Sequence, residues 1–209
     1  MYSYNDSEKW QKSCPDVFWG EIAPCEHVVQ IYEDDNSFVD LLQGFVSSGF
    51  IAQDSVIVIA TPGHLAALDQ RLKSNGHDVF TLTLRDQYIP LDANEVLNQF
   101  MINAWPDENL FLHVVSTLLG RAKNKGKRVR AFGEMVALLW SQGHNGATVQ
   151  LENLWTEFCN SQSFSLFCAY PRTGFTQKAA DSVMHICNAH SKIISTEKHS
   201  NELYYKNLG

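Results

Sequence analysis

The sequence predicts an α/β domain in which a mainly parallel β-sheet is flanked by helices on both faces, as a three-layer sandwich. Short apolar segments alternate along the chain with longer segments whose apolar residues recur at helical spacing. This alternation is typical of right-handed β-α-β units, which build parallel sheets. Residues 55–60 (SVIVIA) form an almost wholly apolar run, which indicates a strand that helices cover on both faces.

An acidic segment separates the first expected strand from the first expected helix. Residues 27–32 (HVVQIY) have the composition of a strand, and residues 33–36 (EDDN) end it and can cap a helix that starts near Ser37. Apolar residues recur at helical spacing in that helix, which is expected to end at Gly49.

Two further strands are expected before residue 90. Thr61 and Pro62 follow the apolar run at residues 55–60 and are typical of an N-cap and a first helical position, so a helix is expected from there to Asn75. The apolar and β-branched residues 79–84 (VFTLTL) predict the third strand.

The second half of the chain continues the alternation. Asp92, with Glu95 three residues later, resembles a capping box that opens a helix through Met101. The remaining elements are expected as helices over residues 107–123, 135–141, 147–160 and 179–191, and as strands over residues 129–132 and 163–170.

A single domain is expected, because 209 residues suit one hydrophobic core. Residues 1–25 show little periodicity and contain two prolines, so they are expected to form a loose N-terminal arm. The domain proper is expected to cover residues 26–195, and the polar residues 196–209 are expected to form a C-terminal tail or linker.

Charge and cysteine usage exclude several classes of protein. The 16 basic and 23 acidic residues give a formal net charge of −7, which argues against a nucleic-acid-binding groove. The basic run at residues 121–130 is expected to be a solvated helix end and loop. Five scattered cysteines without a CxxC pair predict reduced thiols in a cytoplasmic protein. The N-terminal residues lack the apolar core of a signal peptide, and no apolar run approaches the roughly 18 residues that span a membrane.

The candidate binding residues follow from the predicted sheet, since ligands of parallel sheets bind at the carboxyl ends of the strands. The residues that come directly after the expected strands are Tyr32, Glu33, Thr61, Arg85, Asp86, Gly133, Glu134 and Tyr170. They are mostly polar or aromatic and include no strand-end Ser–His pair, which favours ligand binding over catalysis. Each of them can alternatively be a residue that ends a strand or caps a helix.

Two glutamates have both a functional and an ordinary interpretation. Glu134 directly follows a strand expected to be buried, so its carboxylate either contacts a ligand or lies in the first turn of a helix, where the helix dipole favours it. Glu152 lies in a helix next to the inward-facing Leu151 and Trp155. It either points inward and joins a network with Glu134 or is an exposed surface residue.

Nucleotide and metal sites are not expected. A P-loop needs glycines and a lysine between a strand and a helix, whereas residues 32–37 (YEDDNS) contain three acids and neither glycine nor lysine. No cofactor and no ATP hydrolysis by the usual route are therefore expected. Of His185, Cys187 and His190, only the last two share a helix face, and a core thiol with a capping or buried histidine is the favoured interpretation. Cys168 is interpreted as a small core residue rather than a nucleophile.

Several segments together resemble the MEDS family, the DcmR-type sensory domain of methanogens and methylotrophs. The segments are HVVQIYEDDNSF, the block from Gly49 through residues 55–61, VRAFGEMVALL, LENLW, FSLFCAYP and HICNAHSKIIS, and the resemblance covers residues 26–195. It implies a RecA/KaiC-like fold with a degenerate ATP-binding loop, and members that sense small molecules, such as hydrocarbon derivatives. The family positions that it implies in this chain are His27, Tyr32, Glu33, Gly133, Glu134, Glu152, Trp155, Cys168 and Tyr170.

The leading hypothesis is a non-catalytic signalling module that binds a small molecule or a partner protein. Its site is expected among Tyr32, Glu33, Thr61, Glu134 and Tyr170, with Glu152 as a further candidate. Members of the family often stand beside histidine-kinase or DNA-binding domains, and the chain shows neither, so its output is expected to pass through a partner protein, or the chain is a fragment. A homodimer is compatible with this hypothesis. The alternatives are a divergent RecA/KaiC-like ATPase, in which Glu134 activates water through a metal, and a docking scaffold without a ligand.

Overall fold

The computed structural model describes residues 10–13, 19–123, 126–175, 180–197 and 200–206. They form an eight-stranded sheet in the order β1-β10-β9-β2-β8-β7-β3-β4. The strands are β1 (Trp10–Ser13), β2 (His27–Tyr32), β3 (Ser55–Ala60), β4 (Tyr88–Asp92), β7 (Val129–Gly133), β8 (Ser165–Pro171), β9 (Lys192–Glu197) and β10 (Ser200–Lys206). The strands from β9 to β4 in this order are parallel to their neighbours, and β10 and β1 extend the sheet in antiparallel fashion at the β9 edge.

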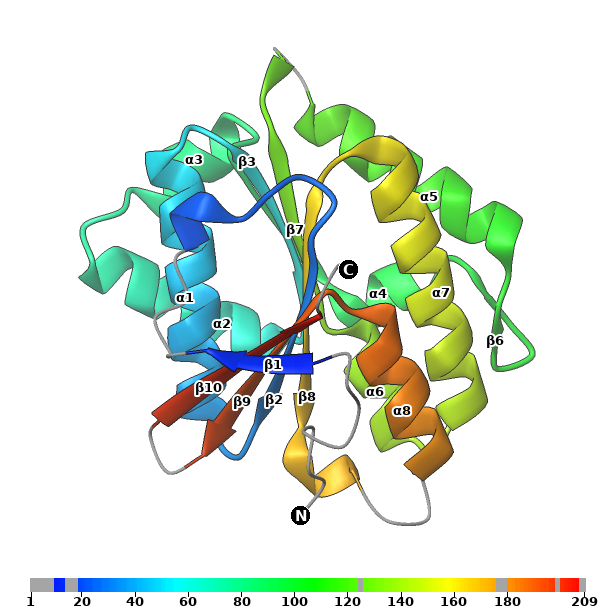
Figure 1. Cartoon of the computed structure of the whole chain (residues 1–209). Helices are drawn as coiled ribbons and strands as arrows, with labels where there is room; N and C mark the ends of the chain where they lie inside the picture. The colour runs from blue at the N-terminus through cyan, green and yellow to red at the C-terminus, as the bar shows by residue number, and fades with distance from the viewer. Residues whose placement is uncertain (1–9, 14–18, 124–125, 176–179, 198–199, 207–209) are drawn as a thin grey trace.

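Helices cover both faces of the sheet (Figure 1). One face carries α1 (Asp35–Ile51), α2 (Pro62–Ser74) and α3 (Val79–Leu84). The other carries α4 (Ala93–Asn98), α5 (Glu108–Ala122), α6 (Met135–Ser141), α7 (Asn145–Gln162) and α8 (Ala180–Ala189). Each helical layer packs its own hydrophobic core against the sheet. The predicted three-layer α/β sandwich with a mainly parallel sheet is confirmed.

Residues 79–84, predicted to be the third strand, form the short helix α3 instead. The carboxylate of Asp78 caps this helix by accepting hydrogen bonds from the backbone N–H and the hydroxyl of Thr81. The neighbour of β3 is therefore the next apolar segment, Tyr88–Asp92, and Arg85 and Asp86 do not lie at a strand end.

Gly49 was expected to end the first helix, but α1 continues past it to Ile51. A Cβ atom at this position would lie 2.7 Å from Val56 Cγ2. The glycine thus allows the helix to approach β3 closely rather than stopping the helix. The helix predicted from Asp92 is shorter than expected, because it ends at Asn98 and Met101 begins a small hairpin of β5 (Met101–Ile102) and β6 (Trp105–Pro106).

The segments predicted to be an arm and a tail contribute strands to the sheet. Residues 200–206 of the expected tail form β10, which pairs with β9, and β1 from the expected arm pairs with β10. In the short helix η2 (Trp19–Glu21) of the arm, Trp19 is buried and its ring lies 5.1 Å from that of Phe45 in α1. Polar residues are compatible with these strands because they lie at the edge of the sheet.

The basic run at residues 121–130 is only partly solvated. Its last residue, Arg130, lies in β7 and is 2% exposed. The alternation of side chains along a strand explains this, since a strand covered on both faces has no solvent-facing side. Within the described ranges, no helix has the length and apolar character needed to cross a lipid bilayer.

Candidate functional site

The carboxyl ends of β3 and β7 bring Thr61 and Glu134 together. Ile59 of β3 is paired with Gly133 of β7, so the residues that follow these strands are neighbours. The Glu134 carboxylate does not cap its own helix, α6. It accepts a hydrogen bond of 2.8 Å from the backbone N–H of Thr61 and contacts His64 Nδ1 at 2.8 Å through its other oxygen. Glu134 is therefore a buried acid with two partners on α2, the helix that starts after β3.

His64 completes this arrangement. It lies in the first turn of α2, and its Nε2 is 3.9 Å from Asp35 in the first turn of α1. Its ring packs edge-on against Phe38, with 4.8 Å between the ring centroids. The hydrogen bond with Glu134 raises the pKa of His64 above its ordinary value, burial opposes this, and the charges of Glu134 and Asp35 add to the increase. We call Asp35, Thr61, His64 and Glu134 the Glu134 cluster.

No pattern considered above points to His64. It lies three residues after Thr61, the N-cap of the predicted helix, so the two share the first helical turn. The spacing of three residues between Thr61 and His64 is the feature of the sequence that places His64 beside the strand end.

Tyr32 and Glu33 differ in their surroundings. Tyr32 is buried and stacks on Phe38, and burial, followed by the charges of Glu134 and Asp35, raises the pKa of its phenol. Glu33 is more exposed and lies 3.7 Å from Arg172 Nε. Tyr32 thus lies beside the Glu134 cluster, while Glu33 is directed towards the segment that follows β8.

Tyr170, predicted to belong to the same site, lies on the opposite face of the sheet. Successive side chains of a strand point to opposite faces, and in β8 this places Cys168 and Tyr170 in the core under α7, whereas Tyr32 belongs to the core under α1. The Tyr170 hydroxyl donates a short hydrogen bond to Glu152 Oε1. The residues expected to form one site are therefore divided between the two faces of the sheet, with Tyr170 on the face opposite Tyr32.

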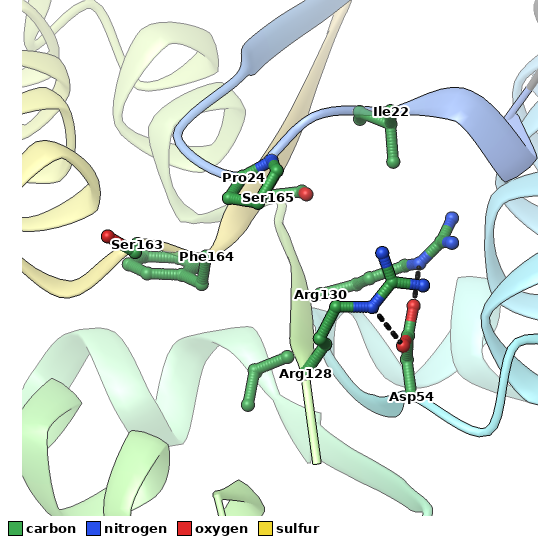
Figure 2. Close-up of a pocket in the computed structure, with 9 residues that line it drawn as sticks. Ile22, Pro24, Asp54, Arg128, Arg130, Ser163, Phe164 and Ser165 are labelled. Atoms are coloured by element: carbon green, nitrogen blue, oxygen red, sulfur yellow. Dashed lines mark hydrogen bonds and ion pairs between the residues drawn. The ribbon is translucent and has the colours of Figure 1, made fainter. Parts of the chain in front are cut away.

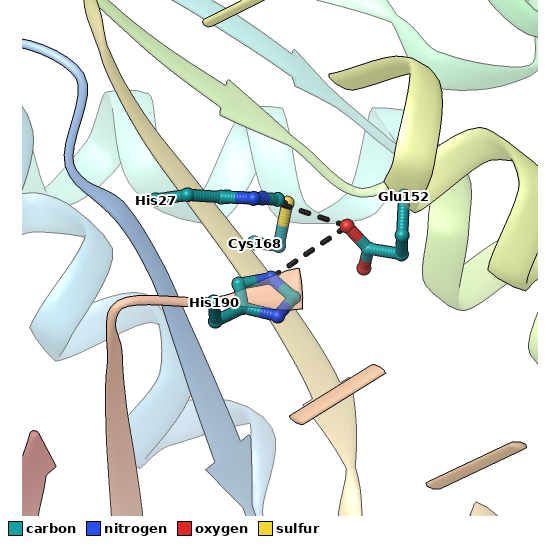
Figure 3. A group of neighbouring side chains, drawn as sticks. All are labelled: His27, Glu152, Cys168 and His190. Atoms are coloured by element: carbon teal, nitrogen blue, oxygen red, sulfur yellow. Dashed lines mark hydrogen bonds and ion pairs between the residues drawn. The ribbon is translucent and has the colours of Figure 1, made fainter. Parts of the chain in front are cut away.

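Glu152 points inward, which agrees with one of the two alternatives given for it. The predicted network with Glu134 is not formed, because Glu152 contacts other residues. Its side chain is 1% exposed, and its Oε2 lies 3.5 Å from His27 Nε2 and 3.6 Å from His190 Nε2. Cys168 Sγ is 3.4 Å from the same nitrogen of His27. Figure 3 shows these four side chains converging from β2, α7, β8 and the residue after α8. We call His27, Glu152, Cys168 and His190 the His27 cluster.

Burial dominates the protonation of this cluster. Loss of hydration raises the pKa of Glu152 to about 8, and the hydrogen bond from Tyr170 opposes the increase. Burial also raises the pKa values of the Cys168 thiol and the Tyr170 phenol, and the nearby Glu152 charge adds to both increases. The sequence patterns predict a metal-binding role for none of these four residues.

The remaining family positions are Gly133 and Trp155. Gly133 is the last residue of β7, and a Cβ atom there would lie 4.0 Å from the Trp155 ring. Trp155 is buried in α7 and meets Phe111 of α5 edge-to-face, with 5.0 Å between the ring centroids. Both residues therefore belong to the packing between the sheet and the helices α5 and α7.

A cavity of about 20 Å³ lies at the opposite edge of the sheet, where the strands begin (Figure 2). Its lining includes Asp54, which pairs with both Arg128 and Arg130. A second cavity, of about 10 Å³, is apolar and lies under α5. Both are close to the volume of a single water molecule and far below the roughly 300 Å³ of a typical ligand pocket.

Comparisons with known proteins agree with this geometry. Among solved structures, the chain is similar to the protein of structural study Project ID PH0250 from Pyrococcus horikoshii OT3, with a TM-score of 0.57, 13% identity, and coverage of 87% of this chain and 86% of that one. It is also similar to the flagellar accessory protein FlaH from Methanocaldococcus jannaschii, with a TM-score of 0.53, 11% identity, and coverage of 89% and 79%. These similarities show a RecA/KaiC-like fold.

No curated protein matches the sequence significantly. The sequence model of the MEDS family, described as the MEthanogen/methylotroph, DcmR Sensory domain, matches residues 26–190. This range contains both clusters and all the parallel strands except β9. The chain therefore belongs to the MEDS family of sensory domains.

Proposed function

We propose that the chain is a non-catalytic sensory module that binds a small molecule at the Glu134 cluster and passes the signal to a separate protein, such as a histidine kinase or a transcription regulator. The observation that carries this proposal is that the protein's own carboxylates occupy the helix N-termini at the carboxyl edge. Asp34 accepts a 2.9 Å hydrogen bond from the Ser37 N–H of α1, and Glu134 accepts one from Thr61 at the start of α2. Helix N-termini bind phosphate through such N–H groups, so this edge disfavours a nucleoside triphosphate.

The same contacts suggest how a ligand would act. Glu134 holds the start of α2 through Thr61 and His64, and His64 lies beside Asp35 of α1. A small polar ligand that replaced one of these contacts would change how α1 and α2 are held against the sheet. A ligand shifts such an equilibrium only by its difference in affinity for the two arrangements. The sensed compound must therefore compete directly with a partner of Glu134.

Thermal unfolding in the presence of small compounds tests this proposal. The panel contains methanol, methylamine, formate and dichloromethane, and separate samples contain ATP or GTP with magnesium. A compound that binds the native state raises the melting temperature. We expect one of the small compounds to raise the melting temperature of the wild type and of a Glu157→Gln control, which changes an exposed glutamate of α7, but not that of Glu134→Gln.

Three results would contradict the proposal. A shift with ATP or GTP at millimolar concentration would favour the divergent nucleotide-binding alternative. An equal shift in wild type and Glu134→Gln would place the binding site elsewhere. A protein that responds to none of the small compounds would favour the docking scaffold over the small-molecule sensor.

A further inference from the structure

The His27 cluster has the composition and spacing of a transition-metal site. It contains two imidazoles, one thiol and one carboxylate, which are the ligand types that zinc(II) binds in proteins. One ligand atom from each residue lies within 4.8 Å of every other, and all four residues are buried. The three separations of 3.4, 3.5 and 3.6 Å among these atoms agree with the ~3.3–3.8 Å between neighbouring ligands of a tetrahedral ion bound at ~2.0–2.3 Å.

Both histidines are oriented for metal binding by their second ring nitrogen. His190 Nδ1 lies 2.6 Å from the backbone carbonyl of Ile186, which can only accept, so this nitrogen carries the proton. His27 Nδ1 lies 3.1 Å from Thr156 Oγ1. That hydroxyl donates its own hydrogen to Glu152 O and so accepts from the imidazole. In both neutral rings the lone pair is then on Nε2, the nitrogen that faces the cluster. Metal-binding histidines are typically fixed in this way by a carbonyl or hydroxyl behind them.

The carboxylate shows the same division of roles. Tyr170 donates to Glu152 Oε1, so Oε2, the oxygen close to both imidazoles, is left as a single-atom ligand. A carboxylate with 1% exposure is costly in an apolar core unless it is paired or coordinates a cation. Beside it, the two imidazole rings lie only 3.9 Å apart between centroids, which disfavours protonation of both. A divalent cation would compensate the charge of the carboxylate without protonating either ring.

We propose that the His27 cluster binds one zinc(II) ion through His27 Nε2, His190 Nε2, Cys168 Sγ and Glu152 Oε2. Binding releases the proton of the Cys168 thiol and any proton on the Glu152 carboxyl to solvent, because the thiolate and the carboxylate are the ligands. Four protein ligands leave no position for a reacting water, so the site is a closed one. It joins β2, α7, β8 and the residue that follows α8, and thereby fixes both ends of the matched family range to each other.

Metal reconstitution of the full chain tests this proposal. The protein, carrying no polyhistidine tag, is unfolded with a chelator and refolded under reducing conditions with no metal, zinc(II) or cobalt(II). We expect one zinc per chain by elemental analysis and a higher melting temperature than that of the metal-free sample. We expect the cobalt form to show a thiolate-to-cobalt charge-transfer band and the intense visible bands of a tetrahedral ion.

Variants identify the ligands. Cys168→Ser should abolish the charge-transfer band and weaken zinc binding more than ~100-fold in competition with a chromophoric chelator, since changes at residues that only support a ligand already cost about 10- to 100-fold. Thr156→Val, which removes the hydroxyl behind His27, should weaken binding within that smaller range. Cys159→Ser is the matched control, because this buried thiol contacts the Phe164 carbonyl outside the cluster.

The proposal is overturned if the folded wild type takes up less than a stoichiometric amount of zinc. It is also overturned if the cobalt form lacks the thiolate band, or if Cys168→Ser binds as tightly as Cys159→Ser. Those results would make the cluster a hydrogen-bonded core network. If Cys168→Ser does not fold, as judged by circular dichroism, the stoichiometry and cobalt spectrum of the wild type decide alone. Glu134→Gln should bind zinc as the wild type does, so this test is independent of the sensory site.

Discussion

His64 connects three elements at the carboxyl edge, because it contacts Glu134 before α6 and approaches Asp35 of α1 from its own helix, α2. Its side chain is 19% exposed, so it can exchange protons with solvent while remaining in contact with Glu134. When His64 is protonated, its positive charge therefore strengthens its contacts with Glu134, which precedes α6, and with Asp35 of α1.

The stability contributed by His64 should depend on pH. The folded state raises its pKa above 6.5, so its contribution is complete below that value and is lost as the pH rises through the raised pKa. We expect His64→Gln to lose about 1–3 kcal/mol of unfolding free energy at about pH 5.5 and less at about pH 9. Urea unfolding at both pH values measures this difference. An equal loss at the two pH values would show that the pairing with Glu134 and Asp35 does not stabilise the protonated form.

Arg130 and Arg128 share the partner Asp54 but differ in burial. Arg130 is 2% exposed and also donates to the Trp19 carbonyl, whereas Arg128 is 59% exposed. Arg130→Gln should lower the unfolding free energy by about 3–5 kcal/mol, because it leaves Asp54 buried with a weakened partner set. Arg128→Gln removes an exposed guanidinium while Asp54 keeps its buried partner Arg130, so it should cost less than about 1 kcal/mol. Chemical denaturation of both variants checks this, and similar losses for the two would contradict the role of burial.

At the scale of elements, replacing glycine by alanine should have opposite effects on stability in two helices. Alanine is favoured over glycine in a helix by about 1 kcal/mol. Gly49→Ala in α1 should nevertheless destabilise the protein by about 1–3 kcal/mol, because the new Cβ would lie 2.7 Å from Val56. Gly120→Ala in α5 meets no atom within 4 Å and should stabilise it by about 0.5–1 kcal/mol. Melting temperatures of the two variants provide the measurement, and a gain for Gly49→Ala would refute the close approach of α1 to β3.

Most elements of the parallel sheet could be predicted, because β2, β3 and β8 are apolar on both faces and their composition alone identifies them. Residues 79–84 could not, since VFTLTL alternates like a strand and the deciding contact is a cap from the preceding Asp78. The small hairpin after α4 and the edge strands β1 and β10 were missed for a related reason. Strands β1 and β10 are largely polar, and only their pairing across the whole length of the chain makes them strands. The hairpin strands β5 and β6 have two residues each, which is too short for an alternating pattern to be recognised.

The candidate sites were predictable to different degrees. Thr61 and Glu134 follow neighbouring parallel strands, so their proximity follows from the predicted fold. The His27 cluster joins residues separated by up to 163 positions on four elements, since residue 27 meets residue 190, and no local spacing indicates it. The face to which Tyr170 points depends on the side-chain alternation within β8, which requires the exact strand start to be known.

At the scale of the whole molecule, β10 protects the edge of the parallel sheet. It pairs along β9, and Tyr204 is buried against the core under α8. A chain that ends at Glu197 should lose at least about 2 kcal/mol of unfolding free energy, since burial of one large side chain contributes about 1.5–3 kcal/mol. It should also self-associate, because an unpaired apolar edge strand pairs with other chains. Denaturation and light scattering measure both effects against a chain that ends at Lys206, and equal behaviour of the two would contradict this role of β10.

The antiparallel pairing of β1 with β10 places Trp10 opposite Lys206, so the path of the backbone almost closes into a ring. Partner strands in a sheet are only about 5 Å apart, which a few linking residues can bridge. A circularly permuted chain, opened at an exposed turn such as that at Gly76, would then keep every strand in its place. For the same reason, a domain joined before β1 and a domain joined after β10 would both leave from one corner of the sheet.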